Sequence, residues 1–144
     1  MPIAQLNVAK IRYSLEDERM SGFVDNLEHI NGLAESMDGF IWRLKDEEGD
    51  ATSFQAFDDP DIISNLSVWQ SVEALKQFVF HTEHKFFLAR KKEWFVPMTM
   101  PSLVLWPIER DETPTLEQAV ARLTYLREHG DSDYAHSFRY TQKA

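Results

Sequence analysis

The chain has 144 residues with no cysteine, and its 24 acidic residues outnumber its 15 basic residues to give a formal net charge of −9. The missing cysteine excludes a disulfide framework and a thiol nucleophile, while the negative charge argues against nucleic acid and anionic membrane surfaces as partners. A single domain covering residues 1–144, without a secretion signal or an apolar run of roughly 18–20 residues that could span a membrane, is expected to be soluble and cytoplasmic.

The first third of the chain predicts a strand, a helix and a second strand. Residues 3–11 alternate apolar and polar side chains, which is typical of a half-buried strand. From Met20 to Ala34 the apolar residues recur at helical spacing, and Gly39 is expected to end this helix in a left-handed conformation. Residues 40–44 predict a strand with alternating faces, Phe40, Trp42 and Leu44 on one and Ile41 and Arg43 on the other.

The middle of the chain predicts a loop, a strand and a broken helix. Residues 45–61 are acidic and predict a loop or a loose hairpin arm, and residues 62–69 predict the next strand. Ser71 is a suitable N-cap for the helix that follows. We expect that helix to break near Thr82, which would cap a second helical piece running toward Trp94.

The last third predicts another strand, a helix and an edge strand. Residues 102–106 form an apolar run that predicts the strand. Thr115 followed by Gln118 has the spacing of a capping box at the start of a helix, and Gly130 is expected to stop it. Residues 135–140 predict a fifth strand at the edge of the sheet.

The predicted elements follow the order β-α-β-β-α-β, with an extra helix and strand at the end. This is the order of the ferredoxin-like split βαβ arrangement, an α+β fold. The strands carry apolar side chains on both faces, whereas the two main helices cover one face, and an exposed apolar face is costly. A second copy packing sheet to sheet would cover the other face, so we expect a homodimer. The competing interpretation is that the third helix folds across it.

Four passages of the sequence resemble a known family over nearly the whole chain. They are AQLNVAKIR, NLEHINGLAE with DGFIWRL, NLSVWQSVEALKQFVFHTEHKFFLARKKEWF, and PSLVLW. They are similar to an uncharacterised bacterial domain family related to the antibiotic-biosynthesis-monooxygenase-like dimeric α+β barrels. The resemblance implies that fold and a dimer, and it carries no established reaction.

The wider superfamily includes haem-degrading and carotenoid monooxygenases, chlorite dismutase-like proteins and cofactor-free quinone-forming oxygenases. The segment from Val68 to His84 is similar to the region that ends in the iron-binding histidine of the haem enzymes, so the resemblance implies haem as a cofactor and His84 as its ligand. Asn7 matches an asparagine on their first strand. Their site tryptophan falls near Phe78, where this sequence departs from the pattern.

His84 is the leading candidate for a catalytic or metal-binding residue. If Thr82 caps the second helical piece, His84 lies in its first turn, where the positive helix end favours the neutral imidazole that binds metals. Phe87 shares its apolar-rimmed face, which would suit haem or a flat organic ligand. The alternative is a structural histidine that is bonded to a carbonyl group.

Two asparagines inside predicted strands indicate a pocket. Asparagine is a poor strand former, yet Asn7 and Asn65 both lie in strands, and Trp69 is in phase with Asn65. We expect the two amides to orient a ligand or dioxygen, with Trp69, Phe78 and Phe87 shaping the pocket. The alternative is that the amides bond the backbone at a bulge or an edge. Arg43 also requires a partner, such as Asp46 or a carboxylate of the ligand.

Two functional hypotheses follow from these residues and the resemblance. The first is a haem-binding or monooxygenase-like protein that acts on a small hydrophobic molecule, with His84 as iron ligand or general base. The second is a ligand-binding or structural dimeric module without catalysis.

Overall fold

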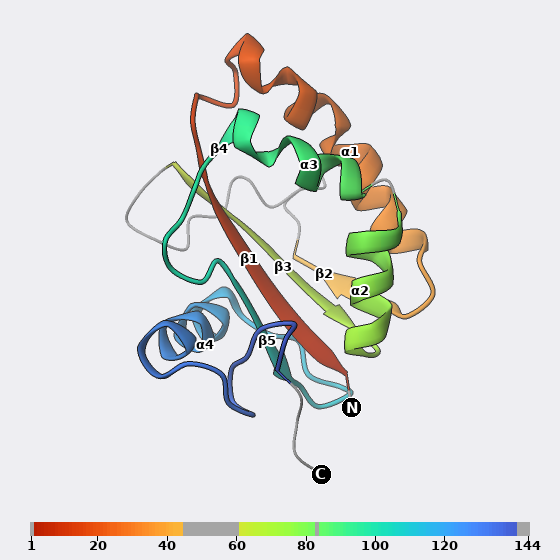
Figure 1. The fold of residues 1–144 in the computed structure, drawn as a ribbon. Coiled ribbons are helices and arrows are strands. Elements are labelled where there is room, and N and C mark those ends of the chain that lie inside the picture. The colour runs from red at the N-terminus through yellow and green to blue at the C-terminus, as the bar shows by residue number, and fades with distance from the viewer. Residues whose placement is uncertain (1, 45–60, 83, 141–144) are drawn as a thin grey trace.

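The computed structural model describes residues 2–44, 61–82 and 84–140, which form a mixed α+β fold with one antiparallel sheet (Figure 1). The strands and helices follow in chain order: β1 (Ile3–Ile11), a 3-10 turn η1 (Glu18–Met20), α1 (Ser21–Ser36), β2 (Phe40–Arg43), β3 (Ile62–Trp69), α2 (Val72–His81), α3 (His84–Trp94), β4 (Phe95–Val96), β5 (Leu103–Pro107) and α4 (Leu116–His129). None of these helices is both long and apolar enough to cross a membrane.

Strand β1 is the centre of the sheet. It pairs along most of its length with β3, and β2 pairs with the far side of β3. On its other side β1 pairs with β5 at one end and with the short strand β4 at the other. The described strands therefore run β2-β3-β1, with β5 and β4 sharing the last position.

Helices α1, α2 and α3 lie on one face of the sheet and α4 lies on the other (Figure 1). Beneath the three helices the apolar side chains form two separate clusters. The α2-side cluster comprises Ile3, Ile30, Ala34, Trp69, Leu75, Phe78 and Leu105. The α3-side cluster comprises Ile11, Met20, Phe23 and Trp94 at the opposite end of β1.

The second face of the sheet is buried within the single chain. Leu6, Val104 and Trp106 on this face form one core with Ala119 and Leu123 of α4, and each is no more than 2% exposed. The third predicted long helix thus folds across the sheet, which is the alternative to a covering second copy. Over β1 and β5 this face is therefore covered without a second copy of the chain.

Most predicted elements are confirmed. The strands at residues 3–11 and 62–69 have the predicted bounds. The Ser71 hydroxyl accepts from the Ala74 N–H at the start of α2, and the capping box of Thr115 and Gln118 is complete.

The glycines that were predicted to end helices behave differently from each other. Gly130 caps α4 with a φ of 78°, as expected. Helix α1 instead ends at Ser36, and Gly39 adopts its φ of 90° in the turn that leads into β2.

A β-bulge in β2 corrects the predicted faces of that strand. Phe40 lies opposite Trp69, but Trp42 lies opposite Val68 and Arg43 opposite Ser67. The extra residue shifts the alternation, so Phe40 shares the helix-covered face with Arg43 rather than with Trp42.

The predicted strand at residues 135–140 is wrong in extent. Only a single bridge forms, between His136 and Leu105. Side chains bend the chain on either side of it, because Asp131 accepts from the Ser137 N–H at 2.8 Å and Ser132 accepts from the Ala135 N–H at 3.3 Å. The short strand β4, and not residues 135–140, completes the five-stranded sheet.

Candidate functional site

The helix-covered face of the sheet changes from apolar to polar along β1 and β3. At one end Ile3 lies opposite Trp69, within the α2-side cluster. Two residues further along the same face Gln5 lies opposite Ser67, and two residues beyond that Asn7 lies opposite Asn65. Polar side chains thus fill the middle of this face, between the two apolar clusters.

Gln5 and Ser67 form a buried hydrogen-bond network, with exposed fractions of 4% and 5%. The Gln5 Nε2 donates to the Ser67 Oγ at 2.8 Å and to the Asn65 Oδ1 at 2.7 Å. The Trp69 Nε1 also donates to the Ser67 Oγ, at 2.9 Å. The network connects the core tryptophan to Asn65, and it satisfies an indole N–H that would be costly to bury alone.

The amides of Asn7 and Asn65 form an exposed pair at the centre of the sheet. Directly opposite residues in antiparallel strands have Cβ atoms about 4.5–5.5 Å apart, so one small molecule can reach both side chains. Across the described residues, neither polar atom of the Asn7 side chain has a hydrogen-bond partner, and the Asn65 Nδ2 has none either. The pair is therefore free to bind a ligand.

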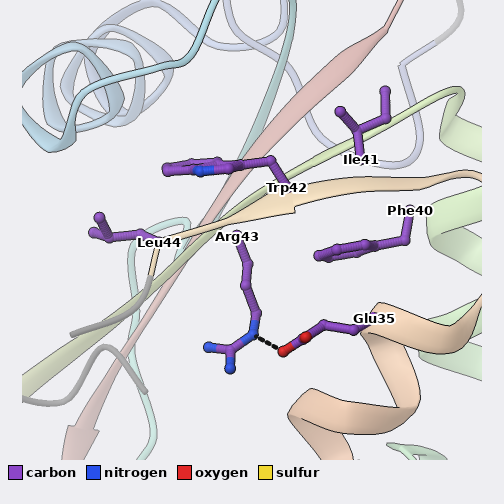
Figure 2. A pocket seen from close by; sticks show the side chains of 6 residues that line it. All are labelled: Glu35, Phe40, Ile41, Trp42, Arg43 and Leu44. Atoms are coloured by element: carbon purple, nitrogen blue, oxygen red, sulfur yellow. Dashed lines mark hydrogen bonds and ion pairs between the residues drawn. The ribbon is translucent and has the colours of Figure 1, made fainter. Parts of the chain in front are cut away.

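Arg43 on β2 lies opposite Ser67 and brings a charged side chain to this polar face. Its side chain is 8% exposed and its Nε lies 2.8 Å from the Glu35 Oε1 of α1. Figure 2 shows Arg43 and Phe40 on the side of β2 that faces α1, with Trp42 on the other side. The expected partner Asp46 lies outside the described residues, and Glu35 was not anticipated.

A hollow of about 280 Å³ surrounds this ion pair along β2 (Figure 2). Its lining comprises Glu35, Phe40, Ile41, Trp42, Arg43 and Leu44. Because the opposite charges of Glu35 and Arg43 neutralise each other, the hollow has no net charge from its own lining. Asn31, one helical turn before Glu35, is a further buried polar residue on the sheet-facing side of α1.

Two of the aromatic residues predicted to shape the pocket, Trp69 and Phe78, belong to the core. Trp69 is 1% exposed and Phe78 is 8% exposed, and their rings stack with centroids 5.4 Å apart. Phe40 meets Trp69 edge to face at 5.4 Å. The structure therefore connects Trp69 to Asn65 through Ser67 and Gln5, and not across an open space.

His84 is the first residue of α3, as its predicted place in a first helical turn requires. The side chains of His84 and Phe87 lie outside the described part of the structure, so their roles stay predictions. The break before them is present. Thr82 ends α2, where its hydroxyl donates to the Phe78 carbonyl at 2.5 Å, and its own carbonyl accepts from the Lys85 N–H.

No group of three or more metal-binding side chains occurs among the described residues. Gln5 was not singled out from the sequence as a site residue. A signal for it exists, because Gln5 is in phase with Asn7 and antiparallel pairing of Asn7 with Asn65 places Gln5 opposite Ser67. That signal becomes visible only once the strand register is known.

Comparison with known proteins gives one family and a likeness in fold. The family model described as "Domain of unknown function (DUF3291)" matches residues 2–144, which confirms the expectation of an uncharacterised domain family. The solved structure of Rv0793 from Mycobacterium tuberculosis has a TM-score of 0.51 and 14% sequence identity, and the match covers 78% of this chain and 100% of that one. At this identity the likeness shows the fold alone. No curated protein matches the chain.

Proposed function

The chain belongs to the DUF3291 family of domains of unknown function, and we propose that it binds a small, largely apolar organic molecule over the amide pair of Asn7 and Asn65. The observation that carries this proposal is the exposure of both amides at the centre of the sheet, between two apolar clusters. Asparagine is a poor strand former. The Asn7 side chain and the Asn65 Nδ2 have no hydrogen-bond partner among the described residues, so a role in ligand binding accounts for these two asparagines in the strands.

Carboxamides orient a ligand without exchanging protons with it. Each amide donates and accepts hydrogen bonds and stays neutral, so the pair can hold a carbonyl, a hydroxyl group or dioxygen. Along the described strands of this face, Arg43 is the ionisable side chain nearest to the amides, and it is paired with Glu35. This composition favours binding as the primary function.

A monooxygenase-like reaction would require a further group, and we propose His84 for that role. As the first residue of α3 it lies at the positive end of a helix, which favours a neutral imidazole able to accept a proton or to bind iron. The reaction class is proposed from the superfamily resemblance, and the apolar character of the substrate from the half-buried side chains of Ile63 and Leu103 beside the amides.

His84, as a proposed iron ligand, is the basis for proposing haem as a cofactor. Haem, when bound, would supply oxygen activation. Trp69 and Phe78 cannot line a haem pocket, because their rings stack on each other inside the core. The described residues thus fit a small hydrogen-bonding ligand better than haem.

We further propose that the fold is the ferredoxin-like split βαβ and that the chain forms a homodimer. The strand order β2-β3-β1-β5, with α1 and α2 on one face, supports the first part. The dimer is proposed from the resemblance. Sedimentation velocity at micromolar concentration tests it, since the monomer has a mass of 16.8 kDa and a dimer has twice that mass.

The binding proposal is tested with 2-acetylnaphthalene, a flat apolar ketone. In 15N-labelled protein the side-chain NH2 signals of Asn7 and Asn65 should shift during the titration, while that of Asn26 on α1, whose Nδ2 donates to the Gly22 carbonyl, should not. Asn65→Leu should weaken binding about tenfold or more. Equal shifts at Asn26, or unchanged binding by the variant, would reject the site.

A further inference from the structure

We infer that Gln5 is a positioning residue that turns the Asn65 amide so that its NH2 group faces the ligand. The site would then select ligands that present a hydrogen-bond acceptor to Asn65, such as a ketone, quinone or enolate oxygen. This inference rests on the proposed binding function, and it adds a direction to the hydrogen bond and a chemical class to the ligand.

The direction follows from groups whose hydrogen-bonding character is fixed. The backbone carbonyl of Asn65 can only accept, and it lies 3.2 Å from the nearer terminal atom of the Gln5 amide. That atom is therefore the Gln5 nitrogen. An oxygen there would place two acceptors in contact inside a buried network, where unfavourable electrostatics are weakly screened.

The indole of Trp69 is consistent with the same direction. Its Nε1 can only donate, so the Ser67 Oγ acts as an acceptor toward it at 2.9 Å. The Gln5 nitrogen donates to the same oxygen at 2.8 Å, which uses the second lone pair of the hydroxyl. Ser67 and Gln5 are both buried, so solvent does not compete for these bonds.

The consequence for Asn65 is that its oxygen is turned toward Gln5. The Gln5 nitrogen donates to the Asn65 Oδ1 at 2.7 Å, and this leaves the Nδ2 group of Asn65 on the exposed side. The described structure gives that NH2 group no protein acceptor. A ligand oxygen can therefore accept from it, whereas an amine would meet a second donor.

The orientation alone is tested without any ligand. In the proposed arrangement the Gln5 NH2 protons and the Trp69 indole proton both approach the Ser67 Oγ, so a nuclear Overhauser effect should connect them. A flipped Gln5 amide would place its oxygen there and remove the effect. Its absence would overturn the inference whether or not a ligand binds.

The selectivity is tested with two ligands of one ring system, 2-acetylnaphthalene and 2-naphthylamine. The unaltered protein should bind the ketone about tenfold more tightly than the amine. Gln5→Met removes the donor at similar size and lets the Asn65 amide rotate, so the amine should gain affinity and the ratio should fall toward one. Gln70→Met, at an exposed glutamine just after β3, should leave the ratio unchanged.

Two results of the titrations would overturn the acceptor preference. One is tighter binding of the amine by the unaltered protein, and the other is an unchanged ratio in Gln5→Met. If neither compound binds, the proposed function fails, and the Overhauser measurement still decides the direction of the Gln5–Asn65 hydrogen bond.

Discussion

Asn7 on β1 and Asn65 on β3 are direct cross-strand partners, and both are exposed on the sheet face that carries three helices. The next positions on that face are buried on one side of the pair, where Gln5 and Ser67 lie, and half-buried on the other side, where Ala9 and Ile63 lie. Along this face of β1 and β3 the amide pair is therefore more exposed than the positions directly before and after it. This exposure distinguishes a site open to solvent from the packed core two residues away.

Replacing Asn7 should separate binding from stability. We expect Asn7→Leu to weaken 2-acetylnaphthalene binding while unfolding at the same or slightly higher urea concentration, because leucine is the better strand former and strand propensities span about 1 kcal/mol. Isothermal titration and urea unfolding measure the two effects. A loss of more than about 1 kcal/mol in stability would instead indicate that the Asn7 side chain has a structural role.

Two serines on β3 should respond in opposite ways to replacement by alanine. Ser67→Ala leaves the buried Trp69 Nε1 without its acceptor, and an unpaired buried donor costs about 1–3 kcal/mol. Ser64 is also buried, but its Oγ has no partner within the described residues, so Ser64→Ala should be neutral or stabilising. Equal losses of unfolding free energy in both variants would contradict the network.

The sequence predicts this fold well wherever one local signal fixes an element. Thr115 and Gln118 fix the start of α4, and alternation over eight or nine residues fixes β1 and β3. The bulge in β2 escapes prediction because it adds one residue to a strand of four, and nothing in FIWR marks which residue is extra. The position of α4 also depends on tertiary packing, which periodicity cannot distinguish from a dimer contact.

The candidate site is predictable only in part, because its residues come together through strand pairing and packing between distant segments. The two asparagines stand out because they oppose strand propensity, and the sequence places both in strands. Their pairing, and the role of Gln5, depend on strand register, which no single segment encodes. Trp69 and Phe78 illustrate the converse, since large aromatic residues near a predicted pocket are usually core residues.

Gly39 should tolerate no side chain. Its φ is 90°, and a Cβ there would lie 2.6 Å from the Ala74 Cβ of α2, so Gly39→Ala should destabilise by more than about 1 kcal/mol. Gly32 lies inside α1 with open space around it, so Gly32→Ala should stabilise by roughly 0.5–1 kcal/mol. Thermal unfolding compares the two variants, and a destabilised Gly32→Ala would contradict the helix assignment.

Asp17 should remain ionised to unusually low pH. The hydrogen bonds donated by the Arg19 guanidinium, at 2.9 and 3.0 Å, and then the Arg19 backbone N–H lower the pKa of Asp17 from 3.8 to about 2. Because the folded pKa lies below the unfolded value, the stabilising contribution is complete above about pH 4 and is lost as the pH falls toward 2. In an NMR titration Arg19→Ala should raise the pKa of Asp17, while Arg90→Ala, which breaks a separate ion pair with Glu93, should not.

Replacing His84 tests whether the protein binds haem through this residue. It begins α3, immediately after the break that ends α2 at His81. If it is an iron ligand, His84→Ala should abolish the Soret band that forms on haem titration and leave urea unfolding nearly unchanged, because a first-turn side chain adds little to helix stability. His81→Ala, at an exposed position three residues earlier, should keep the band. A flat titration in the unaltered protein would reject haem as the cofactor. A Soret band that survives in His84→Ala would mean that haem binds elsewhere, and a loss of about 1–3 kcal/mol in the variant would identify His84 as a structural hydrogen-bonding residue.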